Sequence, residues 1–356
     1  MERKRSIRTY REGDEEGVFE LFKAVYPSKQ YDRDWWMRWW HWMYRENPAG
    51  TAKIYLVAEQ GKIVAHLAHI PVDLKVGNEI TKACQVADFM SHPDSTFKAM
   101  FLLERRVLRE AEKEGLHITF GFPTEKARPG FIKVGYFEIA FIRPMFKPLN
   151  LENILKTRTN NRFLLKVCAL AGKSAIKTLY RTRKPPAIKG LTMNQVSHFD
   201  HRINQLWAKT GSSHQIMVAR NKEYLNWRYA PPDDNYTIYV AEKAEEVHGY
   251  LVLRCTQQEG RKVVRIFDIV GQSEEVIRCL VFKAVEHSQE EKADVVYCSM
   301  IANRIYFRAL RKNGFISTRF IRGTRFGAYS SSPHISKAFL NDPRNWFVQL
   351  GDTDAL

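Results

Sequence analysis

Two neighbouring apolar runs in the first half of the chain have the pattern of β-strands. IYLVAEQ (residues 54–60) and KIVAHLAHI (62–70) are rich in aliphatic residues, apolar positions alternate in the second run, and Gly61 separates the runs as a turn residue. The segment from Phe97 to Gly115 instead carries apolar residues about one helical turn apart, and Gly115 is typical of a helix end. A strand, a long helix and another strand in this order predict a right-handed crossover between parallel strands. The pattern predicts a mixed α/β fold.

The second half of the chain repeats this order of parts. WHWMYRENP, ending at residue 48, and NWRYAPP, ending at residue 232, are each followed by a pair of strand-like runs. Trp42 corresponds to Trp227 and Asp88 to Asp268, and the Ala-Glu pair of the first strand and a later Gly-aromatic pair also recur. The offset between the copies drifts only from 185 to 179 residues, as small loop differences would cause. We therefore expect two copies of one domain.

The length of 356 residues suits two ordinary cores with a connection between them. We predict an N-terminal domain over residues 1–146, a basic linker over 147–192 and a C-terminal domain over 193–356. Inside the linker, an apolar stripe flanked by lysines indicates an amphipathic helix that ends before Pro185-Pro186. This helix packs across the domain junction in one interpretation and lies on an anionic membrane face in the other.

The net charge of +17 is concentrated in two stretches. Residues 145–193 hold eleven Lys or Arg against Glu152 alone, and residues 295–341 hold eight against no acid. Two basic surfaces follow, unless the charge serves only solubility. Their candidate partners are cofactor phosphates, an anionic membrane, a polyanionic glycan or nucleic acid.

Patterns for secretion, disulfides or metal binding are weak. The amino terminus lacks the apolar core of a signal peptide, no 18 uncharged apolar residues run together, and the five cysteines form no C-x-x-C pair. We therefore expect a cytoplasmic protein with reduced cysteines, peripheral on the inner membrane face if the linker docks there. His66 with His69, and His198 with His201, have a spacing that can bind metal, but no carboxylate completes a set, so we predict no metal.

A tryptophan cluster occupies one short stretch of the first copy. It is interpreted either as core packing, which we favour, or as a stacking platform for a sugar or base. Its members are Trp35, Trp36, Trp39, Trp40 and Trp42.

Three later motifs resemble those of the GNAT superfamily of acyl-coenzyme A N-acyltransferases. They are DFMSHPD (88–94), ITFGFPTEKARPGFIKVGYF (118–137) and, in the second copy, NRIYFRALRKNGF (303–315). Counting both copies, the resemblance covers most of the chain outside the linker. It implies two tandem GNAT domains, each with a mixed sheet.

The resemblance also implies a site for acetyl-CoA, or another acyl-CoA, as co-substrate. In the family, an extended pantetheine binds where two strands splay apart, and its pyrophosphate rests on a Gly-rich loop at a helix N-terminus. The splayed strand would lie at Asp88 to Ser91, and this chain has no glycines where the family has R-G-x-G. The second copy has Glu274 and Glu275 at its helix start, which repel phosphate, so we rank the first copy higher. The implied cofactor-binding residues are Phe89, Met90, Ser91, Thr96, Phe97, Lys98, Ala99 and Met100.

The catalytic roles of the family fall on several candidates here. Its usual acid, a Tyr, would fall at Phe131, which cannot donate a proton, so Tyr136 is the substitute in the first copy. The general base would be Glu125 or His92. In tandem members of the family that acetylate aminoglycosides, the carboxylate at the end of the chain is the base, and here that group would belong to Leu356.

The resulting functional prediction is a cytoplasmic N-acyltransferase. It would move an acyl group, an acetyl group first of all, from coenzyme A to a small-molecule primary amine. An amino sugar of a surface polysaccharide precursor is the acceptor that a W-x-x-x-x-G-D-x-D tail and the basic linker suggest. One rival is an inactive GNAT-fold scaffold or ligand-binding protein. A nucleic-acid binder is the less favoured one.

Overall fold

The computed structural model describes residues 5–27, 32–95, 97–156, 182–185, 187–232, 236–317 and 323–353. The predicted linker helix, Thr96 and Leu356 lie outside these ranges. The first half of the chain forms β1 Arg5–Thr9, α1 Glu15–Val25, α2 Arg33–Arg45, β2 Lys53–Glu59, β3 Lys62–Val76, β4 Glu79–Ser91, α3 Phe97–Lys113, β5 Ile118–Gly121, α4 Arg128–Val134, β6 Phe137–Ile142, β7 Met145–Pro148 and α5 Leu151–Lys156.

The second half follows the same order with one additional short strand between its first two helices. It forms β8 Thr192–Val196, α7 Arg202–Gly211, β9 Ile216–Val218, α8 Lys222–Arg228, β10 Tyr236–Lys243, β11 Glu246–Gln258, β12 Arg261–Gly271, α9 Glu274–Glu290, β13 Val295–Cys298, α10 Arg304–Lys312, β14 Ile316–Ser317, β15 Thr324–Ser330, α11 Lys337–Asn341 and the short 3-10 helices η1 Pro343–Asn345 and η2 Leu350–Asp352.

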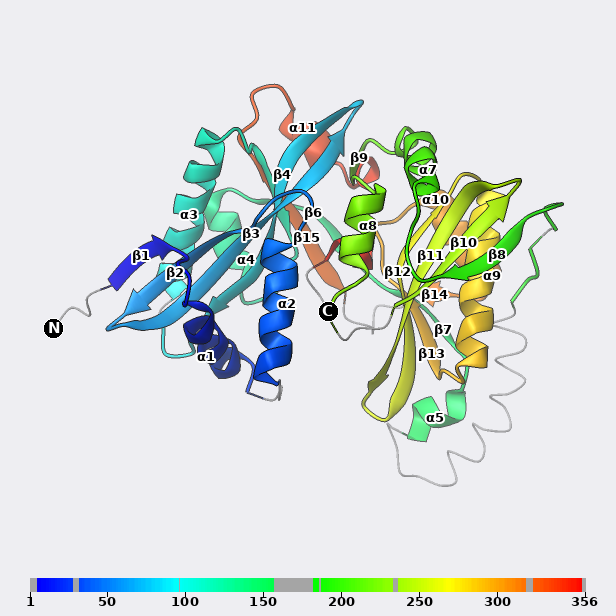
Figure 1. Ribbon diagram of the computed structural model, residues 1–356, viewed down its shortest axis with the longest axis horizontal. Helices are drawn as coiled ribbons and strands as arrows, with labels where there is room; N and C mark the ends of the chain where they lie inside the picture. The colour runs from blue at the N-terminus through cyan, green and yellow to red at the C-terminus, as the bar shows by residue number, and fades with distance from the viewer. Residues whose placement is uncertain are drawn as a thin grey trace.

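Two mixed sheets, one per half, form the frame of the molecule (Figure 1). The first sheet has the order β1-β2-β3-β4-β5-β15-β6, with β9 added to β3, and the second has the order β14-β7-β13-β12-β11-β10-β8. The predicted helix from Phe97 is α3, and it connects the parallel strands β4 and β5 as expected. The predicted α/β class with two sheets is confirmed.

The first sheet is covered on both faces because its strands alternate. Along β2, Ile54 and Leu56 pack under α1 and α2, whereas Tyr55 and Val57 pack under α3 and α4. The predicted core role of the tryptophans is confirmed for Trp36, Trp39, Trp40 and Trp42, which are buried in the layer of α1 and α2. The helices on both faces thus hold β4, which carries the candidate site, inside the sheet.

The two halves exchange strands: the first half gives β7 to the second sheet, and the second half gives β15 and the short β9 to the first. β7 comes from the first half but pairs with β13 and β14 of the second sheet, while β15 comes from the second half and lies between β5 and β6 of the first (Figure 1). One hydrophobic core therefore runs through both halves, from Phe120 of β5 to Leu251 of β11. The division at residues 146 and 193 remains a prediction, and β7 spans its first boundary.

Two equivalent tryptophans join the halves. The indole nitrogen of Trp42 donates to the carbonyl oxygen of Trp227 at 2.8 Å, the indole of Trp227 donates back to Trp42 at 2.9 Å, and the rings stack 5.3 Å apart. The two tryptophans correspond in the sequence repeat, and each makes the same contact with the other. This reciprocity indicates that an approximate two-fold axis relates the halves at this point.

Candidate functional site

β4 and β5 separate soon after they meet. Their parallel register holds at Cys84 with Thr119 and at Gln85 with Phe120. Farther along, the strand partners of β4 lie on β3 alone within the described residues, up to Ser91 with Ala65. One edge of β4 between residues 86 and 91 therefore has no neighbouring strand, and an extended ligand can bind its main-chain groups there.

A bulge at Asp88 shapes the open part of β4. The register between β3 and β4 shifts here, and Asp88 adopts a left-handed backbone with φ of 46°. Asp tolerates this conformation better than most residues, because its short polar side chain bonds locally. The hydroxyl of Tyr44 donates to the Asp88 carboxylate, and His66 Nδ1 lies 2.9 Å from the Asp88 carbonyl oxygen. The first contact orients the half-buried carboxylate, and the second holds the main chain of the bulge.

The predicted cofactor-binding residues lie along this gap and at the start of α3. Met90 is buried and Phe89 and Ser91 are half-buried, with the Phe89 ring 5.1 Å from that of Phe131 on α4. Phe97, Lys98 and Ala99 form the first turn of α3, and Met100 is buried behind them. The end of β4 and the N-terminus of α3 are thus joined by residues 92–96, and the positive end of the helix dipole there suits an anion without any glycine cradle.

The predicted catalytic residues occupy three separate places. His92 follows β4, and its Nδ1 accepts from the Asp94 main-chain N–H at 3.3 Å. Glu125 follows β5 with 72% of its side chain exposed and pairs with Arg325 at 2.9 Å. Tyr136 is buried after α4. Within the described part of the chain, these three residues form no hydrogen bonds with one another, and their roles remain predictions.

Tyr136 belongs to a buried polar network. Its hydroxyl donates to Glu104 Oε1 at 2.6 Å, and Glu104 Oε2 lies 3.4 Å from His69 Nε2. Burial and the neighbouring Glu104 carboxylate raise the pKa of Tyr136 well above its usual value. Burial alone would lower the pKa of His69, but Glu104 and Cys84 outweigh it and raise this pKa to about 9. The His69 and Tyr136 side chains therefore have stabilising partners in the core.

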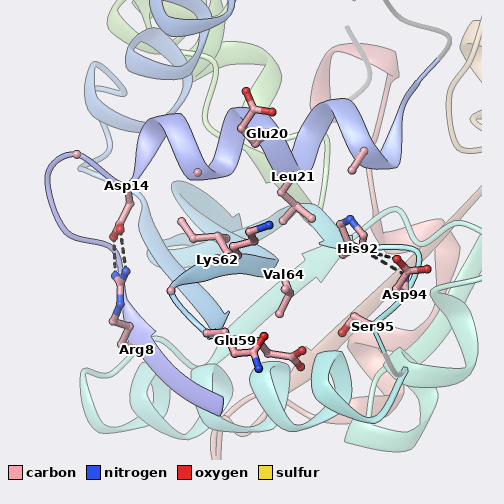
Figure 2. Close-up of a pocket in the computed structure, with 16 residues that line it drawn as sticks. Arg8, Asp14, Glu20, Leu21, Glu59, Lys62, Val64, His92, Asp94 and Ser95 are labelled. Carbon is pink, nitrogen blue, oxygen red and sulfur yellow. Dashed lines mark hydrogen bonds and ion pairs between the residues drawn. The ribbon is translucent and has the colours of Figure 1, made fainter. Parts of the chain in front are cut away.

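A polar hollow of about 780 Å³ adjoins the end of β4. Figure 2 shows Lys62 beneath α1 in this hollow, His92 and Asp94 together on one side, and the Arg8–Asp14 ion pair on the other. The β2–β3 turn forms its floor, with Glu59 among the lining residues. The hollow offers charged groups of both signs beside the loop that leads into α3.

The corresponding gap in the second half is filled by the chain itself. β12 and β13 pair from Val263 to Ile266. Beyond this, the side chain of Gln349 accepts from Ile269 N at 3.1 Å and donates to Ile269 O at 3.0 Å. These are the two main-chain bonds that an added strand or an extended ligand would make. The second half therefore presents its own carboxamide where the first half presents an open edge.

A buried charge network fastens this filling segment. Asp268, the repeat counterpart of Asp88, accepts from Tyr229, Tyr250 and Gln349 at 2.6 to 3.0 Å and from Arg220 at 3.1 Å. Arg220 also binds the Asp352 carboxylate at 2.7 Å. Because the Asp268 carboxylate accepts all these hydrogen bonds from within the protein, we assign it a structural role.

The sequence contained an unused signal for Tyr44 and Asp88. Tyr44 lies two residues after Trp42, Tyr229 lies two residues after Trp227, and both tyrosines donate to the Asp of their own half. The repeat thus preserves a Tyr–Asp pair, which pattern matching against the family motifs did not identify. No comparable local signal existed for Gln349.

Comparison with known proteins agrees with this architecture. Residues 6–137 match the family model of the acetyltransferase (GNAT) domain. A GCN5-related N-acetyltransferase from Anabaena variabilis is similar, with a TM-score of 0.66, 12% identity and coverage of 91% of this chain and 72% of that one. A probable N-acyltransferase of unknown function from Enterococcus faecalis gives a TM-score of 0.64, 10% identity and the same coverages.

A second kind of similar structure is N-myristoyltransferase from Saccharomyces cerevisiae, solved with bound myristoyl-CoA. It gives a TM-score of 0.61 at 11% identity and covers 96% of this chain and 88% of that one. At such identities the likeness concerns the fold alone. No curated protein matches the sequence. Among the described residues, none of the helices is both long and apolar enough to span a bilayer.

Proposed function

Since this chain is a GNAT-superfamily protein, with an acetyltransferase domain in residues 6–137 and a second GNAT-like unit behind it, we propose that it is an N-acyltransferase. It transfers an acyl group, with acetyl as the first choice, from coenzyme A to a primary amine. The cofactor is a co-substrate, and the proposal involves no metal.

The divergence of β4 from β5 after Gln85 is the observation that carries this proposal. A thiol cofactor with an amide-bearing arm can extend along the free edge of β4, and its phosphates can approach the N-terminus of α3. Gln349 occupies the equivalent edge in the second half, so the proposal assigns one acyl-CoA to each chain, in the first half.

The chemistry requires a base near the thioester. The base takes a proton from the acceptor ammonium, the neutral amine attacks the thioester carbonyl, and the departing thiolate takes up a proton. Asp88 is our preferred base because its carboxylate is half-exposed at the gap and is oriented by Tyr44. Glu125 and His92 remain alternative bases, and Tyr136 remains the candidate acid.

The acceptor is proposed at a coarser level as a small-molecule primary amine. The polar hollow beneath α1 is lined by four carboxylates against the two cations Arg8 and Lys62, and this acidic excess supports a polar cationic acceptor. The narrower proposal, an amino sugar of a surface polysaccharide precursor, rests on the tail from Trp346 to Asp354 and on the basic linker. An assay of thiol release with a panel of amino sugars and simple amines distinguishes an enzyme specific for amino sugars from one that accepts primary amines in general.

Calorimetry with acetyl-CoA and longer acyl-CoAs tests the proposal. We expect saturable binding with one site per chain. Lys98→Glu should bind roughly tenfold more weakly, because a carboxylate then replaces a cation at the N-terminus of α3, where the phosphates are proposed to bind. Lys113→Glu at the opposite end of α3 is the matched control and should bind normally. Absence of any acyl-CoA binding would discard the transferase.

The sequence of the cofactor loop favours one alternative, an inactive GNAT-fold scaffold. Side chains at Thr96 to Ala99 replace the glycines that let phosphate approach the backbone in the family. This alternative predicts no acyl-CoA binding in the same calorimetric titration, whereas the enzyme predicts binding followed by thiol release with a suitable amine.

A further inference from the structure

A basic surface covers α10 of the second half and the adjoining end of β6. On α10, Arg304, Arg308 and Arg311 are exposed at i, i+4 and i+7 spacing, which places them on one side of the helix. The opposite side is fixed in the core by Tyr306, Ala309 and Leu310. We call the following six residues the basic face: Arg143, Arg304, Arg308, Arg311, Lys312 and Arg344.

Two adjoining hollows open on the basic face. One, of about 500 Å³, is lined by the four cations of α10, and the other, of about 360 Å³, by Arg143 and Arg344. They share Ala302 and Phe307 as a common wall. Neither has an Asp or Glu side chain in its lining, as far as the described residues go. An anionic group entering either hollow therefore meets cations and apolar atoms.

Internal ion pairs leave part of this charge uncompensated. Glu274 binds Arg308 at 2.7 Å and Lys312 at 3.3 Å, and Asp342 binds Arg344. In the ranges that the structure covers, Arg143, Arg304 and Arg311 make no such pair. The basic face therefore keeps a positive excess, which a negatively charged partner would complement.

Exposed apolar side chains lie on α10 itself and on the strands β6 and β14, which contribute residues to the lining of one of these hollows. Ile305 of α10 is 44% exposed, Phe141 of β6 is 43% exposed and Ile316 of β14 is 37% exposed. Basic residues mixed with exposed aliphatic ones are typical of surfaces that contact a membrane interface, whereas single-stranded nucleic acid is usually bound by aromatic stacking platforms. We propose that the basic face docks the protein onto an anionic phospholipid surface, independently of acyl transfer.

Vesicle co-sedimentation of the full chain tests this docking. The probes are vesicles of phosphatidylglycerol with phosphatidylcholine and vesicles of phosphatidylcholine alone. The test variant is Arg304→Gln/Arg311→Gln, which removes two unpaired, exposed cations without touching the core. Each cation near an anionic leaflet changes partitioning roughly fivefold, so we expect about 30-fold weaker binding to the anionic vesicles, and little binding of either protein to the neutral ones.

A matched control removes the same charge elsewhere. Arg109→Gln/Lys113→Gln alters two exposed cations of α3 and should bind anionic vesicles as the unaltered chain does. Equal losses in the two double variants, or unaltered binding in the test variant, would overturn the assignment to this face. The proposal would also be overturned if the unaltered chain bound no vesicles. A chain that binds oligonucleotides but no vesicles, and loses that binding only in the test variant, would instead assign the basic face to nucleic acid. Thermal melting of every variant checks that its fold is retained.

Discussion

At the scale of single residues, the Asp88 carboxylate combines a left-handed backbone, a hydrogen bond from Tyr44 and a place on the open edge of β4. If it is the base, Asp88→Asn should lower kcat/KM by about 10² to 10⁴, because an amide cannot take the ammonium proton. Acyl-CoA affinity should remain unchanged, since the amide oxygen can still accept from Tyr44. Steady-state kinetics across pH, together with calorimetry, measure both quantities.

Asp94→Asn is the control for this substitution. Asp94 lies in the loop after β4, with 86% of its side chain exposed. Its amide variant should retain the rate. If Asp88→Asn also kept the normal rate, Asp88 would not be the base, and Glu125 or His92 would be the remaining candidates.

His214 provides a pH prediction for stability. Its ring stacks on Phe347 at 4.1 Å, and burial, with Arg220 and Lys75 nearby, lowers the pKa of His214 to about 4. In the unfolded chain this pKa is about 6.5, so between these values the unfolded state binds a proton that the folded state does not. The free energy of unfolding therefore falls as the pH drops, by about 2 kcal/mol from this group between roughly pH 7.5 and pH 5.

His214→Phe keeps the stacked ring and removes the titration. Urea unfolding at the two pH values should show a pH-dependent loss smaller by about 2 kcal/mol in this variant. His334→Phe, at an exposed position, is the control and should keep the original loss. An unchanged loss in His214→Phe would mean that other groups cause it. Of the remaining slope, His66 and His287 contribute in the same direction because burial lowers the pKa of each, whereas the raised pKa of His69 opposes it.

At the scale of elements, the side chain of Gln349, just before η2, takes the place of an added strand beside the end of β12. Gln349→Ala removes two bonds to Ile269 and one to Asp268, all buried, so we expect a loss of roughly 3 kcal/mol in the free energy of unfolding. Gln195→Ala, at an exposed position of β8, should change stability by less than about 0.5 kcal/mol. Chemical denaturation measures both, and equal small effects would show that the carboxamide does not hold the segment.

The elements themselves were largely predictable from local pattern. Alternation over residues 62–70 and the helical spacing after Phe97 correspond to β3 and α3, because each pattern reports burial along one chain segment. The gap near Phe89 and Met90 also agrees with the register of β4 and β5. The placement of Gln349 against Ile269 could not be predicted this way, because a partner 80 residues away leaves no periodicity in either segment.

At the scale of the whole molecule, the repeat predicted two units but not how they share strands. β7 and β15 are short strands, and their own sequences do not indicate which sheet each one joins. Their partners are decided by fit at distant edges, where β13 accepts β7 and β5 accepts β15. Sequence periodicity identifies a strand, whereas its sheet is a property of the complete chain.

The exchange of strands makes each half dependent on the other for folding. A fragment of residues 1–156 lacks β15, which leaves β5 and β6 without the strand between them and removes buried Phe326 from the core. We expect this fragment, and equally residues 182–356, to show no cooperative thermal transition alone. Co-expressed, the two should co-purify and unfold in one transition, because both sheets are then complete. A cleavable site introduced in residues 157–181 is the control, since cutting it in the folded protein should leave that transition in place. Either fragment melting cooperatively alone would show that its sheet tolerates the missing strand and that the halves are separate folding units.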